Sequence, residues 1–249
     1  SNISFFKNLN DINSENSIIF NSVMEKELDK SELWQHFQGI EIETPKKTFD
    51  DKIINLMDFN CDQRNYVHFF YTLPFSKNKA LVETTWISDL GDESLRDYDL
   101  QLKNYIENKL GIKNYKINFT EKGAIPLFSP SLSNNNKIIN IGSAGGMTRL
   151  STGYTFLNIQ EHSRYIVKNI DNINSAKIFS LGKKYQLLDK VFLKVLKKYP
   201  EKMPQIFFNM FKTSSNTIIK FLSNKSNFIE DVYIVSKMPK LIFLKALFN

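Results

Sequence analysis

The sequence predicts a mixed α/β fold, with an antiparallel sheet in the first half of the chain and helices at the end. Three observations support this fold class. Apolar and polar residues alternate repeatedly between residues 34 and 87, a glycine-rich turn follows a short apolar strand at 137–141, and apolar residues at helical spacing recur after residue 177. The chain therefore changes from a strand-rich to a helix-rich pattern along its length.

The strands are predicted from alternation with a period of two residues, and from the turn residues that separate the strands. Pro74 and the polar run 76–79 are the clearest of these turns. Several short strands in succession indicate a mainly antiparallel sheet. The expected strands lie at residues 17–24, 39–44, 53–59, 66–73, 80–87, 116–120, 123–128 and 137–141.

Helices are expected where apolar residues recur every three or four positions. Residues 171–176 are polar and are expected to be a linker between the glycine-turn region and the helical end of the chain. The expected helices lie at residues 94–110, from about 151 to 170, and at 185–199, 203–211, 217–222 and 240–248.

Composition excludes several classes of protein. The 249 residues carry a net charge of +7, but the lysines are scattered and no lysine run exceeds a pair, which favours a solvated surface over a nucleic-acid groove. A role at an anionic membrane surface stays open. The single cysteine, Cys61, allows no intramolecular disulfide and no zinc spacing, so we expect a cytoplasmic protein without a metal site. We find neither a signal peptide at Ser1–Asn10 nor a run of about 18 apolar residues.

The glycine turn at Gly142–Met147 is the first candidate site. A strand, a glycine turn and a helix start in succession suit an anion or a cofactor, because glycines let a ligand approach the backbone and a helix start presents free N–H groups. A tight turn that merely requires small residues explains the pattern equally well.

The second candidate is Glu83, an acid among apolar and aromatic neighbours in a predicted strand. Alternation places Leu81, Glu83 and Thr85 on one face. If that face lines an apolar pocket, burial raises the pKa of the acid, and a protonated carboxyl can protonate a carbon–carbon double bond. An exposed strand residue is the alternative, and composition alone favours it. Asp58 is a similar acid in an apolar run that could orient a partner, stabilise a cation or cap a strand end.

Several blocks of the chain are similar, in the same order, to those of the lycopene cyclases of bacteria and plants. The resemblance extends from about Ile18 to the end of the chain. The blocks are Trp34–Gly39, Leu56–Phe59, Tyr71–Ser76, Leu81–Thr85, Gly123–Pro126, Ile141–Met147 and Ser151–Tyr154.

This resemblance implies an FAD enzyme with a glutathione-reductase-like or hydroxylase-like two-domain fold. It divides the chain into a remnant of the FAD-binding domain (1–33), a substrate-binding sheet (34–128), a returning FAD-binding strand, turn and helix (129–176), and a helical region (177–249). The implied activity is lycopene β-cyclisation, which closes the linear ψ ends of lycopene into β-rings to give γ-carotene or β-carotene. Reduced FAD and NAD(P)H as reductant are the implied cofactors.

The resemblance also implies roles for individual residues. Glu83 matches the first acid of the family's Phe-Leu-Glu-Glu-Thr block, so it would protonate the end group, and Asp58 is the second candidate acid. Ring closure through a tertiary carbocation and loss of a neighbouring proton would follow, with anionic reduced flavin stabilising the cation. The implied flavin-contacting residues are Gly142, Ala144, Gly145, Gly146, Met147, Ser151, Thr152, Gly153 and Tyr154.

The sequence departs from the family pattern at three places. Thr84 replaces the second acid of the block, and Asn21 and Val23 stand where many members carry Asp and Arg. The Gly-x-Gly-x-x-Gly motif that binds the FAD pyrophosphate is expected on the order of a hundred residues before Ser1. We therefore expect a fragment that binds FAD weakly and is inactive in isolation.

A substrate dissolved in the membrane implies a chain that lies peripherally on the inner face of the cell membrane. The basic charge and the segment Lys240–Phe248 could make this contact, although the segment could equally pack on the core. Two alternatives to a cyclase stay open: another flavoprotein of the same superfamily, such as a monooxygenase or a geranylgeranyl reductase, and a non-catalytic carotenoid-binding module.

Overall fold

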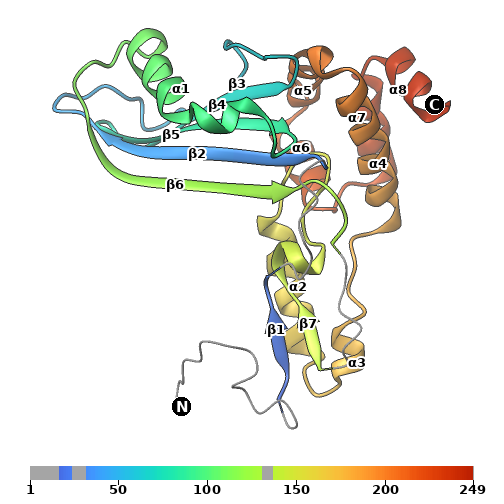
Figure 1. Ribbon diagram of the computed structural model, residues 1–249. Helices are drawn as coiled ribbons and strands as arrows, with labels where there is room; N and C mark the ends of the chain where they lie inside the picture. Colours follow the sequence, from blue (N-terminus) through green and yellow to red (C-terminus); the bar gives the residue numbers. More distant parts are fainter. Residues whose placement is uncertain (1–16, 24–31, 131–136, 249) are drawn as a thin grey trace.

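The computed structural model describes residues 17–23, 32–130 and 137–248. Its largest element is a five-stranded sheet, drawn across the upper part of Figure 1, in which every neighbouring pair is antiparallel. The strand order is β3-β4-β5-β2-β6. The mixed fold class with an antiparallel sheet is therefore confirmed. The strands are β2 (Trp34–Glu43), β3 (Asn55–Asp58), β4 (Val67–Ser76), β5 (Lys79–Ser88) and β6 (Lys116–Pro126).

The last strand of this sheet differs from the expectation. Residues 116–120 and 123–128 were expected as two strands, but β6 runs without a break from Lys116 to Pro126. It pairs with β2 along its whole length, with a register shift between Glu41 and Ile42. The polar residues Glu121 and Lys122 suggested a break between two strands. Because β2 pairs with both of them, the strand continues through this point.

A second, small sheet lies below the large one in Figure 1. Strand β1 (Ile19–Asn21) pairs in parallel with β7 (Ile138–Asn140), as expected for a strand that returns to an earlier one. Strand β7 runs into the 3₁₀ turn η4 (Gly142–Gly145), followed by helices α2 (Phe156–Lys168) and α3 (Ile173–Ala176). Helix α3 occupies part of the segment that was expected to be a linker.

One face of the large sheet is covered by the segment between β5 and β6. This segment was expected to be one helix at 94–110, but it divides into η2 (Glu93–Arg96), α1 (Tyr98–Asn104) and the π-helical turn η3 (Tyr105–Lys109). Its apolar residues pack on the sheet residues whose side chains point to this face. The buried cluster consists of Ile40, Ile42, Phe70, Val82, Leu102, Tyr105, Ile106 and Ile112.

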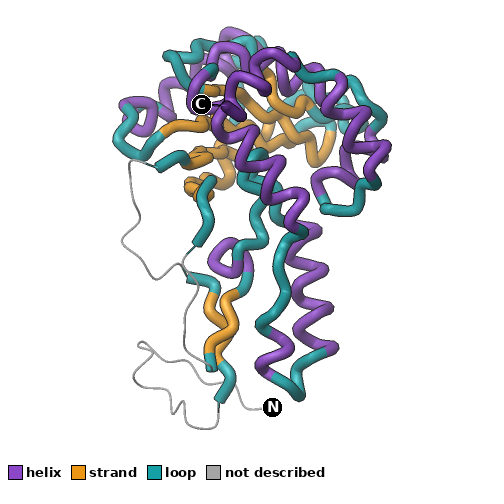
Figure 2. Tube along the Cα trace, turned by 90° about the vertical axis from the view of Figure 1, so that its right-hand side faces the viewer, coloured by secondary structure: helices purple, strands orange, loops and turns teal. Residues whose placement is uncertain are grey.

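The C-terminal helices cover part of the opposite face, and Figure 2 shows them in front of the strands. They are α4 (Lys183–Lys198), α5 (Met203–Phe211), α6 (Ser215–Leu222), α7 (Phe228–Ser236) and α8 (Lys240–Phe248), with the short 3₁₀ turn η5 (Pro200–Lys202) between α4 and α5. The largest core cluster joins Val67, Phe69 and Ile87 of the sheet to these helices. No helix in the described ranges is long and apolar enough to cross a bilayer.

Candidate active site and cofactor turn

Glu83 lies in the middle of β5, on the face that the C-terminal helices partly cover. In register, its neighbours are Tyr71 on β4 and Gly39 on β2, and Gly39 in turn faces Glu121 on β6. The hydroxyl of the fully buried Thr85 donates a hydrogen bond of 2.7 Å to Oε1 of Glu83. The expected grouping of Glu83 and Thr85 on one face is therefore observed.

Burial makes Glu83 a weaker acid than an ordinary exposed carboxyl. Loss of hydration raises the pKa of this half-buried carboxyl to about 7, with a further rise from the negative charge of Glu121, while the hydrogen bond from Thr85 acts in the opposite direction. Burial, together with the nearby Glu83 charge, also raises the pKa of Tyr71, which keeps that phenol neutral. The site thus holds an acid that is substantially protonated near neutral pH.

Thr84, which replaces the second acid of the family block, belongs to the opposite face. It is completely buried, donates to Oε1 of Gln101 at 2.7 Å and lies 2.9 Å from Nε2 of His68. The ring of His68 stacks on Trp86 at a centroid distance of 3.8 Å. Burial lowers the pKa of His68 to about 4, so this ring is neutral. An acid at position 84 would point into this network and away from the Glu83 face.

The structure does not bring Asp58 together with Glu83. Asp58 pairs with Phe70, whereas Glu83 pairs with Tyr71, the next residue of β4. Adjacent residues of a strand point to opposite faces, so the two acids are separated by the sheet. Oδ2 of Asp58 accepts a hydrogen bond of 2.8 Å from the Tyr105 hydroxyl on the face covered by α1. Oδ1 of Asp58 also accepts from the Asn60 N–H just beyond β3, so among the uses considered from sequence the capping of a strand end fits this geometry best.

The glycine turn lines a cavity of about 750 Å³, within the range of small-molecule sites. Ser143, Gly145, Gly146 and Met147 form one side, and Lys190 and Lys194 of α4 are among the residues of another. Ala144 is buried beneath the turn. A Cβ on Gly145 would lie 2.5 Å from the carbonyl oxygen of Asn140, so the turn can pass this point only as glycine.

Gly142 and Gly146 have positive φ angles of 61° and 76°, and a Cβ on Gly142 would meet no atom within 4 Å. The turn therefore exposes bare backbone next to a cavity. This arrangement fits the polar edge of a flat cofactor, which needs close approach to main-chain groups.

The segment Ser151–Tyr154 was expected to open a helix, and this expectation is wrong. The N–H groups of Thr152 and Gly153 both donate to the carbonyl of Arg149, and the N–H of Tyr154 lies 3.4 Å from Oγ1 of Thr152. The segment is a closed turn, and α2 begins only at Phe156. The left-handed φ of 69° at Gly153 explains the interruption, because it cannot continue a helix.

This turn nevertheless reaches the Glu83 face of the sheet. A Cβ on Gly153 would lie 2.3 Å from Oε1 of Gln35, so the two residues are in direct contact. Gln35 pairs with Ile87, four residues beyond Glu83 on β5, which corresponds to about 13 Å along the strand. The turn thus contacts the same face of the sheet as Glu83, towards the end of β5.

A buried ion pair that sequence reasoning missed holds this turn on α4. The side chain of Arg149 is completely buried and forms an ion pair of 2.7 Å with Asp189. Asp189 also accepts a hydrogen bond of 2.7 Å from Ser151, and Arg149 donates to the carbonyl of Phe221. The sequence did contain a sign of this ion pair. Asp189 follows Tyr185 by four residues, so it lies on the buried face of α4, where an acid needs a partner.

The fold, an antiparallel sheet with helices on its faces beside a short parallel pair of strands, has a similar counterpart among solved structures. The structure resembles a geranylgeranyl bacteriochlorophyll reductase-like protein of Thermoplasma acidophilum with a TM-score of 0.52 and 14% sequence identity, covering 88% of this chain and 55% of that one. The family model described as lycopene cyclase protein matches residues 14–247, so the chain belongs to the lycopene cyclase family. This result confirms the resemblance found in the sequence.

A curated relative agrees with this assignment. The chloroplastic lycopene beta cyclase of Solanum lycopersicum is 32% identical over an alignment of 133 residues that covers 49% of this chain and 26% of that protein. The matched part is therefore about a quarter of the relative's length. The family implies FAD as cofactor, and the glycine-turn cavity offers residues that fit it.

Proposed function

We propose that this chain carries the catalytic acid of a lycopene β-cyclase, which converts the linear ψ end groups of lycopene into β-rings. The observation that carries the proposal is the position of Glu83 on the sheet face that the C-terminal helices partly cover. Glu83 is a half-buried acid there, and burial raises its pKa to about 7. Protonation of an isolated alkene requires an acid that is still protonated near neutral pH, and ordinary exposed carboxylates are not.

In the proposed reaction, Glu83 gives its proton to the terminal alkene of the end group. Ring closure then leaves a tertiary carbocation, and the loss of a proton from a neighbouring carbon completes an isomerisation in which no atoms are gained or lost. The hydrogen bond from Thr85 favours the Glu83 carboxylate that remains after the first step. Tyr71, directly opposite Glu83, adds a neutral aromatic ring of the kind that stabilises a cation.

For the cofactor, we propose that Gly142, Gly145, Gly146 and Met147 hold the flavin, with Ala144 packed beneath them. The same site would extend towards the sheet along the turn that contains Ser151, Thr152, Gly153 and Tyr154. The Arg149–Asp189 ion pair would hold this turn in place. Reduced FAD, with NAD(P)H as its reductant, would supply negative charge near the reacting end group.

The test is a carotenoid profile in bacteria that accumulate lycopene. The chain would be expressed alone and fused to the N-terminal dinucleotide-binding segment of another family member, and pigments would be separated by chromatography. We expect the fusion to convert lycopene to γ-carotene or β-carotene, and the chain alone to leave it unchanged. Unchanged lycopene in the presence of folded, flavin-loaded fusion protein would reject cyclisation.

The same assay separates the alternatives. The cyclic products are isomers of lycopene and have its mass, whereas a reductase adds hydrogen and a monooxygenase adds oxygen. A reductase is among the alternatives because the Thermoplasma acidophilum protein with a similar fold is described as geranylgeranyl bacteriochlorophyll reductase-like. Carotenoid that copurifies without conversion would instead indicate a binding module.

A further inference from the structure

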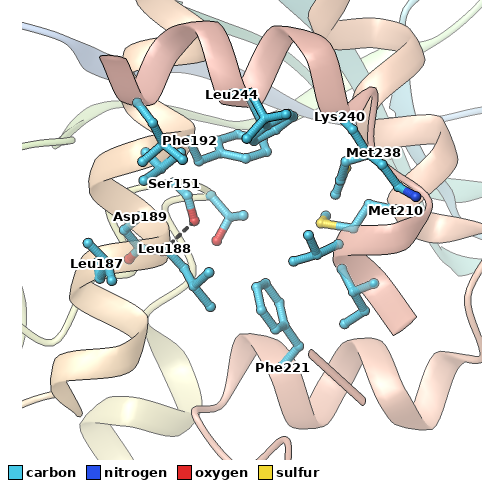
Figure 3. Close-up of a pocket in the computed structure, with 16 residues that line it drawn as sticks. Ser151, Leu187, Leu188, Asp189, Phe192, Met210, Phe221, Met238, Lys240 and Leu244 are labelled. Atoms are coloured by element: carbon cyan, nitrogen blue, oxygen red, sulfur yellow. Dashed lines mark hydrogen bonds between the residues drawn. The ribbon is translucent and has the colours of Figure 1, made fainter. Parts of the chain in front are cut away.

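An apolar cavity of about 430 Å³ lies among helices α4 to α8 (Figure 3). Neither Glu83 nor the glycine turn lines it, whereas Ser151 and Thr152 of the turn before α2 do. Phe192, Met210, Phe221 and Met238 are among the side chains that surround it. Its polar lining is restricted to Ser151, Thr152, Asp189 and Lys240, and Asp189 is already bound to Arg149 and Ser151. The cavity therefore suits a hydrocarbon and offers little to a polar ligand.

Two stripes of exposed apolar residues lead to the mouth of this cavity. We call them together the α7–α8 surface. Three or four residues separate successive members, so each stripe lies along one side of its helix. The surface consists of Phe228 (77% exposed), Val232 (50%) and Val235 (46%) on α7, and Leu241 (74%), Leu244 (49%) and Leu247 (49%) on α8. Val235, Leu244 and Leu247 also line the cavity, so the cavity opens on this surface.

Positive charge is concentrated in the same part of the chain. Residues 177–249 contain 14 lysines and four acidic residues, whereas residues 1–176 contain 19 basic and 22 acidic residues. The whole net charge of +7 therefore originates in the helical region. Lys237, Lys240 and Lys245 are exposed and lie beside the two stripes. Apolar side chains flanked by lysines match the two layers of an anionic bilayer, its hydrocarbon and its headgroups.

We propose that the α7–α8 surface docks on an anionic lipid bilayer and that the adjoining cavity opens towards the bilayer hydrocarbon. The charge argues against a second copy as the occupant, because two such surfaces would bring like charges together. Docking explains why so much apolar area stays exposed in one region around an apolar cavity. The proposal does not depend on cyclisation, since vesicle binding is measured without lycopene or flavin.

Flotation of the 249-residue chain with vesicles tests the proposal. The vesicles are phosphatidylcholine alone or phosphatidylcholine mixed with phosphatidylglycerol. We expect binding to the mixed vesicles that weakens with salt. Leu241→Glu should weaken this binding at least about tenfold, because a charge replaces a side chain that enters the hydrocarbon boundary. Val167→Glu on α2 is the matched control, since Val167 is 73% exposed and lies outside the surface.

The lysines are tested separately. Lys237→Ala and Lys240→Ala should each weaken binding to the mixed vesicles about fivefold at low salt and have little effect on phosphatidylcholine alone. A circular dichroism spectrum and a melting curve for each variant exclude misfolding as the cause.

A probe at the cavity mouth locates the contact. In a Cys61→Ser background, Val235→Cys would carry a polarity-sensitive dye, with Val167→Cys as the control position. We expect a blue shift on the mixed vesicles only at position 235. The proposal is overturned if Leu241→Glu floats as well as the parent chain, or if the dye at Val235 shifts with protein concentration instead of lipid, which would indicate a second copy on this surface.

Discussion

Nη2 of Arg149 lies 2.7 Å from Oδ1 of Asp189, and the ion pair that these residues form is almost inaccessible to solvent. It joins the turn that precedes α2 to the middle of α4, with Ser151 and the Leu150 N–H as further donors to the same carboxylate. The turn that we assign to the edge of the cofactor site therefore depends on a charge in the C-terminal helical region.

Asp189→Leu should lower the free energy of unfolding by about 3–5 kcal/mol, because it leaves the Arg149 guanidinium buried without a counter-charge. Urea unfolding measures this change. Lys197→Ala, which breaks the exposed pair with Glu32 at 3.0 Å, is the control and should change stability by less than about 1 kcal/mol. The double variant Arg149→Leu/Asp189→Leu should recover part of the loss. A loss no larger than that of Lys197→Ala would show that the buried pair does not hold the turn.

The raised pKa of Glu83 makes stability depend on pH. The folded chain holds the Glu83 proton up to a pKa of about 7, whereas the unfolded chain loses it near 4.5. The stabilising contribution of the neutral carboxyl is therefore present below pH 4.5 and is lost as the pH rises towards 7. Glu83→Gln should remove this fall, so that the variant exceeds wild type by on the order of 1–3 kcal/mol at pH 8 and matches it at pH 4. Parallel pH profiles for both proteins would argue against a protonated Glu83.

Asp58→Asn should leave cyclisation within about twofold of wild type. The carboxylate accepts from the Asn60 N–H at Oδ1 and from the Tyr105 hydroxyl at Oδ2. In the variant the amide oxygen can keep the Asn60 contact, and the Tyr105 hydroxyl can accept from the amide NH2 instead. Conversion of lycopene by the fused chain measures the effect. A loss comparable to that of a Glu83 variant would restore Asp58 as the second catalytic acid.

Gly145→Ala should reduce flavin retention in the fused chain at least about tenfold. Its Cβ would lie 2.5 Å from the Asn140 backbone oxygen, which cannot move away without displacing β7 and the turn. Gly182→Ala is the control, because its Cβ would meet Tyr185 at an ordinary 3.6 Å. Flavin absorbance per purified protein is the measurement. Equal flavin content in the two variants would remove the glycine turn from the cofactor site.

The strands of the large sheet could be predicted because side chains of a strand alternate between its two faces, and runs of such residues bounded by turn residues are a local signal. β5 shows this clearly, with Val82, Thr84 and Trp86 on one face and Glu83 and Thr85 on the other. The start of α2 could not be predicted in the same way. It is set by the left-handed Gly153 and by contacts with Gln35, which lies more than a hundred residues earlier.

The candidate site shows the same division between local and long-range information. The position of Glu83 follows from strand alternation, but its raised pKa depends on burial and on the charge of Glu121, which lies on another strand of the sheet. Asp58 looked equivalent to Glu83 in sequence, and only the strand register separates them. Helix α7 was missed although Asn227 and Glu230 form a capping box, a local signal that was present in the sequence.

The most direct test of the central claim compares Glu83→Gln with Glu121→Gln in the fused chain, in cells that accumulate lycopene. Both substitutions remove one carboxylate from the same face of the sheet, and only Glu83 carries the proposed proton. We predict that Glu83→Gln retains folding and flavin but lowers β-ring formation at least about a thousandfold, in the upper range for loss of a general acid, while Glu121→Gln keeps most of the activity. Wild-type cyclisation by folded Glu83→Gln would contradict the account.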